Sequence, residues 1–217
     1  MERDFKIEMS RLEKMVDILL SFVTAGPIQL FSHDLNEIVL KRLENHQKDA
    51  KKIGVKFDAK LDEGGCPPRV NTETIEWIIN QIILNALEVS SKGNTIRIRS
   101  ERHGDNCRLE IEDEGSGIKP EHLTNIFKPF FTTKEVGKGS GLGLAMVYGI
   151  VQNSRGYVHV ESDVAKGTVF DLSFRVATDK DREQSLRRLT PDLAGEETVL
   201  RGGDGPMVRE LGNAMLR

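Results

Sequence analysis

The stretch Gly137-Lys138-Gly139-Ser140-Gly141-Leu142-Gly143-Leu144 decides how this chain folds, and it runs directly into the apolar segment 145–151. Four glycines in seven residues leave the backbone free to adopt positive φ and to approach a ligand closely. The apolar run predicts a helix whose first N–H groups point back into the loop. Such amides attract anions, so the stretch predicts a site for a phosphate chain, with a flexible loop before a core helix as the alternative.

The composition is that of an ordinary soluble globular protein. The 217 residues are 38% hydrophobic and 30% charged, and the net charge of −3 gives no electrostatic reason to expect nucleic acid as a partner. The N-terminus is too charged for a signal peptide, and no apolar run approaches the ~18–20 residues of a membrane span. Cys66 and Cys107 stand alone, without a CxxC motif, which predicts neither a zinc site nor a disulfide. We therefore expect a cytoplasmic location and no membrane segment in this chain.

On both sides of the glycine loop, the spacing of apolar residues predicts a mixture of helices and strands. Helical patterns cover 7–23, 34–52 and 75–87, the last capped by Asn71, and a further helix runs to about 153. Alternation of apolar and polar residues predicts strands at 55–61, 95–101, 106–112, 157–162 and 168–176. The simplest packing is an α/β (α+β) two-layer sandwich, in which helices cover one face of a mixed or mainly antiparallel sheet.

Three further clusters could carry chemistry. Asn85 lies within an apolar helix and could offer its carbonyl to Mg²⁺, or it is a satisfied amide at the helix edge. Asp113, followed by Glu114-Gly115-Ser116-Gly117, could accept a hydrogen bond from an exocyclic amine, or it belongs to an ordinary acidic turn. Lys134, after the aromatic run Phe127-Lys128-Pro129-Phe130-Phe131, could reach a terminal phosphate if this segment closes over the site.

Together, in this order, these clusters resemble the N, G1, F and G2 boxes of the ATP-binding domain of sensor histidine kinases, within the superfamily that includes gyrase, Hsp90 and MutL. Lys166-Gly167-Thr168-Val169-Phe170 is similar to the smaller G3 element. The resemblance spans roughly residues 34–176. An aromatic box just upstream of GxGLGL separates the kinases from the other branches. The resemblance implies the Bergerat-type fold, and it implies ATP and Mg²⁺ as ligands.

The resemblance also assigns roles to individual residues. Asn85 is similar to the Mg²⁺-binding asparagine, and Asp113 to the carboxylate that reads the adenine amine. We expect Asn85 and Lys134 to act in catalysis, Lys134 by reaching the terminal phosphate. The lid is expected at about 119–138. The positions implied around the nucleotide are Asn85, Asp113, Gly115, Gly117, Phe130, Gly139, Ser140, Gly141, Leu142, Gly143, Leu144 and Thr168.

Two departures from the family pattern restrict the function. Gln81 stands where gyrase-like members place a general-base glutamate, which disfavours a hydrolytic ATPase. His33 precedes Asn85 by only 52 residues, which leaves no room for the rest of a dimerisation hairpin, so we do not expect it to be the phosphoacceptor. The implied activity is transfer of the γ-phosphate to a histidine outside this chain. The alternative is a nucleotide-binding regulatory module without autokinase activity.

The expected organisation has three parts. Residues 1–26 resemble the second helix of a dimerisation hairpin, which would allow a homodimer, and 34–176 form the catalytic domain. Residues 177–217 form a linker and a tail, and 197–211 resemble the opening of a receiver domain in which Gly203 and Gly205 replace the expected acids. The tail is a receiver remnant, the stub of a hybrid kinase, or a plain disordered end. The implied partners are a phosphoacceptor histidine domain and a response regulator.

Overall fold

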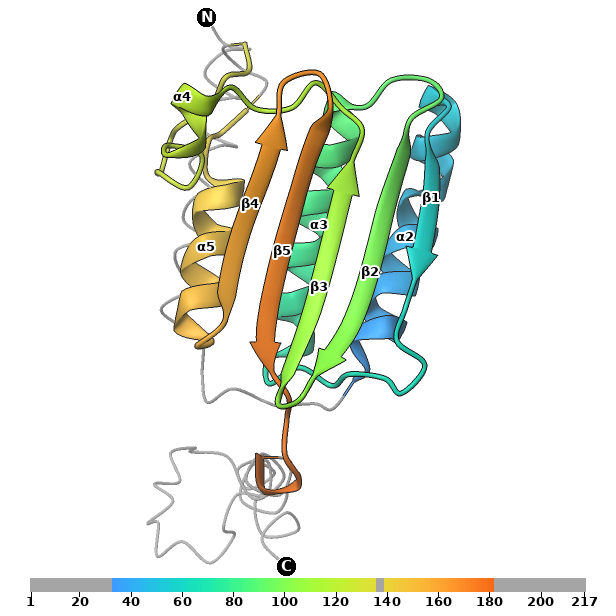
Figure 1. Cartoon of the computed structure of the whole chain (residues 1–217), viewed down its shortest axis with the longest axis vertical. Coiled ribbons are helices and arrows are strands. Elements are labelled where there is room, and N and C mark those ends of the chain that lie inside the picture. The colour runs from blue at the N-terminus through green and yellow to red at the C-terminus, as the bar shows by residue number, and fades with distance from the viewer. Residues whose placement is uncertain (1–32, 136–138, 182–217) are drawn as a thin grey trace, which may run out of the picture. The chain divides into compact units, whose positions relative to one another are not determined.

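The computed structural model describes residues 33–135 and 139–181, and it places a five-stranded sheet against a layer of helices (Figure 1). The predicted helix at 7–23 and the receiver-like stretch lie outside the described residues. The elements in chain order are α2 (Leu35–Ile53), β1 (Lys56–Lys60), α3 (Thr72–Val89), β2 (Thr95–His103), β3 (Asn106–Asp113), α4 (Pro120–Leu123), α5 (Gly143–Asn153), β4 (Tyr157–Asp163) and β5 (Gly167–Arg175).

The sheet is mixed, as the sequence predicts. Its strand order is β1-β2-β3-β5-β4; β1 and β2 are parallel and the other pairs are antiparallel. The parallel pair is joined through α3, because parallel neighbours need a crossover. The central strand β3 pairs with β5, and this pairing places Asp113 opposite Thr168 at one end of the sheet.

The core lies between the sheet and the helices α2, α3 and α5, which all cover the same face (Figure 1). Helix α3 lies behind the central strands, and its apolar residues recur at helical spacing. Its fully buried residues are Ile75, Ile78, Ile79, Ile82 and Ile83. They pack against the inward side chains of the strands, which include Ile96, Ile98, Leu109, Ile111, Leu172 and Phe174. The two-layer prediction is therefore confirmed.

Side-chain caps begin the two long helices. The Asp34 carboxylate accepts from the N–H of Asn36, and the Asn71 amide oxygen accepts from the N–H of Glu73. Each cap satisfies one of the donors that a helix N-terminus leaves unpaired. Gly54, at φ 76°, ends α2 in the left-handed conformation. Capping residues thus set where α2 and α3 begin, and α3 carries the predicted Asn85.

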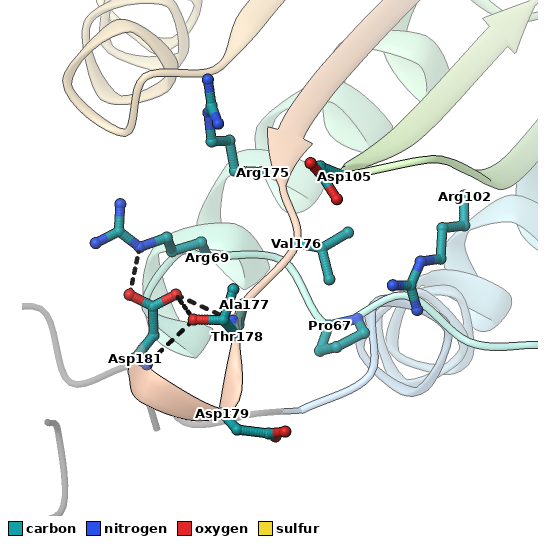
Figure 2. Close-up of a pocket in the computed structure, with 10 residues that line it drawn as sticks. All are labelled: Pro67, Arg69, Arg102, Asp105, Arg175, Val176, Ala177, Thr178, Asp179 and Asp181. Atoms are coloured by element: carbon teal, nitrogen blue, oxygen red, sulfur yellow. Dashed lines mark hydrogen bonds and ion pairs between the residues drawn. The ribbon is translucent and has the colours of Figure 1, made fainter. Parts of the chain in front are cut away.

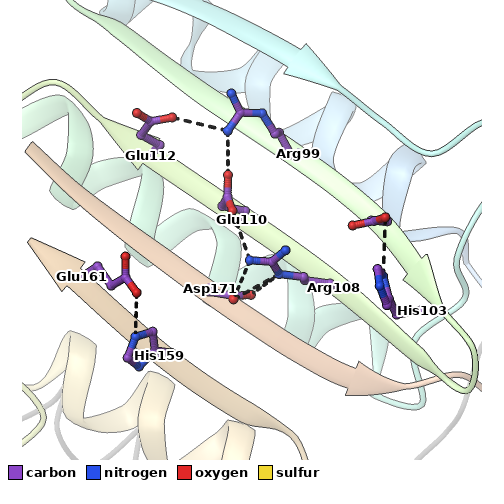
Figure 3. Close-up of polar contacts among 9 residues, drawn as sticks. Arg99, His103, Arg108, Glu110, Glu112, His159, Glu161 and Asp171 are labelled. Atoms are coloured by element: carbon purple, nitrogen blue, oxygen red, sulfur yellow. Dashed lines mark hydrogen bonds and ion pairs between the residues drawn. The ribbon is translucent and has the colours of Figure 1, made fainter.

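Among the described residues, the second face of the sheet carries charged side chains and no helical layer (Figure 3). Arg99 pairs with Glu110 at 2.7 Å, and Arg108 bridges Glu110 at 3.3 Å and Asp171 at 2.9 Å. These pairs run across β2, β3 and β5, because residues two apart on a strand point to the same face. The charges explain why alternation, and not continuous hydrophobicity, marks these strands.

The prediction that the two cysteines form no disulfide is wrong. Cys66 and Cys107 form a disulfide, with their Cα atoms 5.7 Å apart and both side chains fully buried. Cys66 lies in the loop before α3 and Cys107 near the start of β3, and the fold brings these segments together across 41 residues of sequence. Sequence spacing alone does not reveal such a long-range contact.

Two smaller observations complete the fold. The short helix α4 was not predicted from periodicity, since it holds only four residues. Within 33–135 and 139–181, none of the helices combines the length and the apolar character that crossing a membrane requires.

Candidate functional site

The N-terminus of α5 emerges from the glycine loop, as predicted. Gly141 has φ 65°, and a Cβ there would lie 2.4 Å from the carbonyl carbon of Phe130. A Cβ on Gly143 would lie 2.9 Å from the side-chain oxygen of Gln81 on α3. Among the described residues no side chain caps α5 at Leu142, and the first N–H groups of a helix are the ones that bind anions. The glycines therefore allow two close backbone approaches at a helix end suited to phosphate.

Asn85 lies near the C-terminal end of α3, and Lys134 reaches it from the segment that follows α4. The Lys134 Nζ is 3.4 Å from the Asn85 Oδ1, and it also forms an ion pair with Glu88. The structure thus brings together the two residues predicted for metal binding and catalysis. Sequence reasoning gave Glu88 no role in the site, although its position three residues after Asn85 puts it on the same helix face.

Asp113 is buried at the end of β3. Its side chain is only 4% exposed, and it accepts a hydrogen bond of 2.8 Å from the N–H of Gly115. Burial raises the pKa of this carboxyl group, while the backbone N–H groups of Gly115 and Thr168 act to lower it. Burying a carboxylate charge with no cation beside it costs free energy of folding, unless a ligand supplies a hydrogen-bond donor. This environment suits recognition of a polar group on a flat apolar ring.

Thr168 lies beside Asp113 within a small hydroxyl network. Its Oγ1 is 3.0 Å from the Oγ of Ser162 on β4. The Ser162 hydroxyl also donates to the carbonyl of Gly167 and accepts from the N–H of Ile118. Ser162 fixes the segment after β3 to the β4–β5 hairpin. Nothing in the sequence singled out this serine, because its role depends on strands that pair only in the fold.

The glycines after Asp113 permit close packing at this end of the sheet. Gly117 has φ 68°, and a Cβ there would lie 2.0 Å from the carbonyl oxygen of Asp163. A Cβ on Gly115 would lie 2.5 Å from the side chain of Val89 and 2.8 Å from the Asp113 carboxylate. Both predicted glycines therefore let the chain lie directly against neighbouring residues of the site.

The aromatic run divides into a packed part and an exposed part. Phe127 lies 5.1 Å from Tyr148 of α5, measured between ring centroids, and Phe131 lies 5.5 Å from His122. Phe130 is 66% exposed and has φ 67°. Phe130 thus contributes its backbone to the approach of Gly141, while its ring remains on the surface.

The remaining predicted residues belong to the loop and the first turn of α5. The Ser140 hydroxyl accepts from the N–H of Leu142 at 3.3 Å, so it occupies one of the donors before the helix. Gly139 lies against Thr132 and Lys134, and Leu144 packs partly buried against the core. The loop, Asn85 and Lys134 form one cluster, and Asp113 and Thr168 form a second at the same end of the sheet.

A separate pocket lies at the other end of the sheet. It has a volume of about 560 Å³ and is lined by ten residues, among them Arg69, Arg102, Arg175 and Asp181 (Figure 2). Arg69 pairs with Asp181 at 2.9 Å. Strand β5 runs from Gly167 beside Asp113 to Arg175 at this pocket, a span of roughly 26 Å. The pocket is therefore distinct from the predicted nucleotide site.

The donor set limits how a metal ion could be held. The described ranges contain no cluster of three or more histidine, cysteine, aspartate or glutamate side chains suited to a metal. At the glycine-loop end, the oxygens on α3 include the Asn85 amide and the Glu88 carboxylate, and the Lys134 ammonium already lies against both. Hard oxygen ligands fit Mg²⁺, provided that the Lys134 ammonium moves away and that phosphates and water complete the coordination.

Comparison with known proteins agrees with this geometry. The sequence profile of the histidine kinase-, DNA gyrase B-, and HSP90-like ATPase family matches residues 71–178. Sensor kinase CckA of Brucella abortus is 30% identical over 95% of this chain, which spans only 24% of that protein's length.

Two solved structures are also similar. The catalytic domain of histidine kinase ThkA has a TM-score of 0.61 and 25% identity, covering 67% of this chain and 96% of that one. ThkA in complex with the response regulator TrrA has a TM-score of 0.63 at 24% identity, covering 78% of this chain and 48% of that one.

Proposed function

Because the chain belongs, through residues 71–178, to the histidine kinase-, DNA gyrase B- and HSP90-like ATPase family, we propose that it acts as the catalytic domain of a cytoplasmic sensor histidine kinase. In the proposed reaction a histidine nitrogen on a separate domain bonds to the γ-phosphorus of ATP. The bond from that phosphorus to the bridging oxygen breaks, and ADP leaves. The relatives are named kinases, which favours catalysis over a purely regulatory module.

The buried Asp113 is the observation that carries this proposal. Its carboxylate would accept a hydrogen bond from the adenine amine, while Gly115 and Gly117 let the chain pack closely around the proposed ring site and Thr168 lines the same side. The amides at the start of α5 and the glycine loop would hold the phosphates. Adenine and phosphates would thus be bound at one end of the sheet, between α3, α5 and the Phe127–Lys134 segment.

The α3 face opposite the loop would hold Mg²⁺ and position the phosphates. Mg²⁺ would neutralise charge on the phosphate oxygens when bound, and Asn85 would be its ligand from the protein. Gln81 lies against Gly143 at the phosphate end, and its amide cannot take a proton from water at neutral pH. Transfer to an external acceptor is therefore favoured over hydrolysis.

The acceptor histidine would come from another domain or chain. His33 contacts Thr72 at the first turn of α3, with its Nδ1 3.1 Å from the threonine Oγ1. Asn85 lies thirteen residues further along that helix, roughly 20 Å away. The partners we propose are a histidine-bearing hairpin and a response regulator, the class of protein bound to ThkA.

The test is phosphotransfer from γ-labelled ATP, with the full chain alone and with an added dimerisation hairpin from a related kinase. We expect label on the histidine of the hairpin, and none with the Asp113→Asn variant, which should also lose nucleotide binding. Binding of ATP by the parent chain without any transfer would refute the kinase proposal. Unchanged affinity in Asp113→Asn would refute the adenine assignment.

A further inference from the structure

Lys134 contacts two oxygen donors on one face of α3. Its ammonium is 3.4 Å from the Asn85 Oδ1 and pairs with the Glu88 carboxylate. Asn85 and Glu88 are three residues apart, so their side chains lie side by side on the helix. One ammonium group therefore covers both donors at the same time.

These two donors have the chemistry of a divalent-cation site. Amide and carboxylate oxygens are the ligands that Mg²⁺ prefers, and the lysine ammonium is a compact point charge. A divalent cation bound to the Asn85 oxygen would lie next to the Lys134 ammonium, and two neighbouring positive charges repel each other strongly. A divalent cation that binds Asn85 must therefore displace the Lys134 ammonium.

The backbone of the glycine loop sets the path of the Lys134 side chain. A Cβ on Gly139 would lie 2.9 Å from the Lys134 Cδ and 2.7 Å from the Thr132 Oγ1. The N–H of Lys134 donates to that same Thr132 hydroxyl at 3.1 Å. The lysine stem thus passes directly over Gly139, which couples the position of the ammonium to the phosphate loop.

We propose, on the premise of the function argued above, that Lys134 and Glu88 form an exchangeable latch. Without nucleotide, Lys134 holds the cation position beside Asn85. When a divalent cation and nucleotide bind, the cation takes that position, and the ammonium is released toward the terminal phosphate. Glu88 is then a positioning residue that makes nucleotide binding depend on the divalent cation.

The solvent exposure of Lys134 and Glu88 suits replacement of the lysine ammonium by a divalent cation. The side chains of Lys134 and Glu88 are 37% and 50% exposed, so water screens their attraction, and breaking it costs little stability. The latch can therefore give way to a divalent cation without unfolding the segment that carries Lys134.

The experiment measures ATP affinity in EDTA and in excess MgCl₂ for the parent chain, Glu88→Gln and Lys134→Met. We expect Glu88→Gln to reduce the Mg²⁺ enhancement of affinity by roughly tenfold, while its affinity in EDTA is equal to or tighter than that of the parent. Lys134→Met should weaken binding in both conditions and keep the parental enhancement or exceed it, because no ammonium competes with the cation.

Asp49→Asn is the matched control. Asp49 on α2 pairs with Lys52 at 2.8 Å, so this variant likewise removes a carboxylate from an exposed lysine ion pair, and we expect parental values for it. Hydrogen exchange provides a second readout that needs no ligand. Backbone amides of residues 128–134 should exchange faster in Glu88→Gln than in Asp49→Asn, because the latch no longer holds them.

The outcomes separate the latch from the function on which it rests. If the parent binds ATP and Glu88→Gln keeps the parental Mg²⁺ enhancement, or weakens binding equally in both conditions, the latch is wrong while nucleotide binding stands. A loss of enhancement in Lys134→Met as large as that in Glu88→Gln would also overturn it. If the parent chain does not bind ATP at all, the proposed function fails as well.

Discussion

The buried carboxylate of Asp113 lowers the free energy of unfolding by an amount that depends on pH. Burial raises its folded-state pKa above the ordinary value of 3.8, so the folded chain binds this proton more tightly than the unfolded chain does. The cost is absent below the unfolded pKa, and it grows as pH rises through the folded pKa. A residue kept under such a penalty is a candidate for ligand recognition.

The Asp113→Asn variant tests this cost directly. We expect its free energy of unfolding, relative to the parent, to increase as pH rises from about 4 to about 7, because the asparagine has no charge to bury. Urea denaturation across this range measures the difference. Glu161→Gln, which removes a carboxylate with a 77% exposed side chain, should show little change. A constant difference for Asp113→Asn would contradict the raised pKa.

Gly117 and Gly104 form a matched pair for testing close approach. Both have positive φ, 68° and 57°, but a Cβ would lie 2.0 Å from the Asp163 carbonyl oxygen at Gly117 and meets nothing within 4 Å at Gly104. We expect Gly104→Ala to cost about 1–2 kcal/mol from the left-handed backbone alone. Gly117→Ala should cost more than about 4 kcal/mol. Equal shifts in thermal unfolding would show that the segment after β3 can move aside.

At the scale of elements, local signals predicted most of what the structure contains. Asn71 as a cap, the isoleucines of α3 at helical spacing and the alternation in β5 each depend on neighbours in sequence, and each is confirmed. The Cys66–Cys107 disulfide and the hydrogen bond from the Ile118 N–H to Ser162 join segments 41 and 44 residues apart in sequence, so no local pattern could indicate them. Asn85 and Asp113 were identified through family resemblance, since each alone had an ordinary structural explanation.

The two helix-capping side chains differ in the number of backbone N–H groups from which they accept hydrogen bonds. Asn71 caps α3 alone, whereas the Asp34 carboxylate also accepts a 2.8 Å hydrogen bond from the N–H of Cys66. We expect Asn71→Ala to cost about 1 kcal/mol, and Asp34→Ala about 2 kcal/mol or more, because it also releases the loop before α3. Chemical denaturation measures both. A smaller loss for Asp34→Ala than for Asn71→Ala would contradict the double role.

At the scale of the whole molecule, the disulfide joins the loop before α3 to the sheet. Closing 41 residues stabilises the folded state by roughly 3–4 kcal/mol when treated as chain entropy. We expect reductant to lower the melting temperature of the parent chain by roughly 8–15 °C. The Cys66→Ser/Cys107→Ser double variant should not respond to reductant. Two alkylatable thiols before reduction would contradict the bond, which is uncommon in a reducing compartment.

The pairing of β3 with β5 has a consequence for how the chain is made. Asp113 meets Thr168 only across 54 intervening residues, and strand pairing at such separation forms late and slowly. In a nascent chain whose β5 is still inside the ribosome, Asp113, the carboxylate that we propose reads adenine, lacks the backbone N–H of Thr168. Nucleotide capture during synthesis would therefore report that the last strand has docked, and binding would stabilise only chains that have completed the sheet.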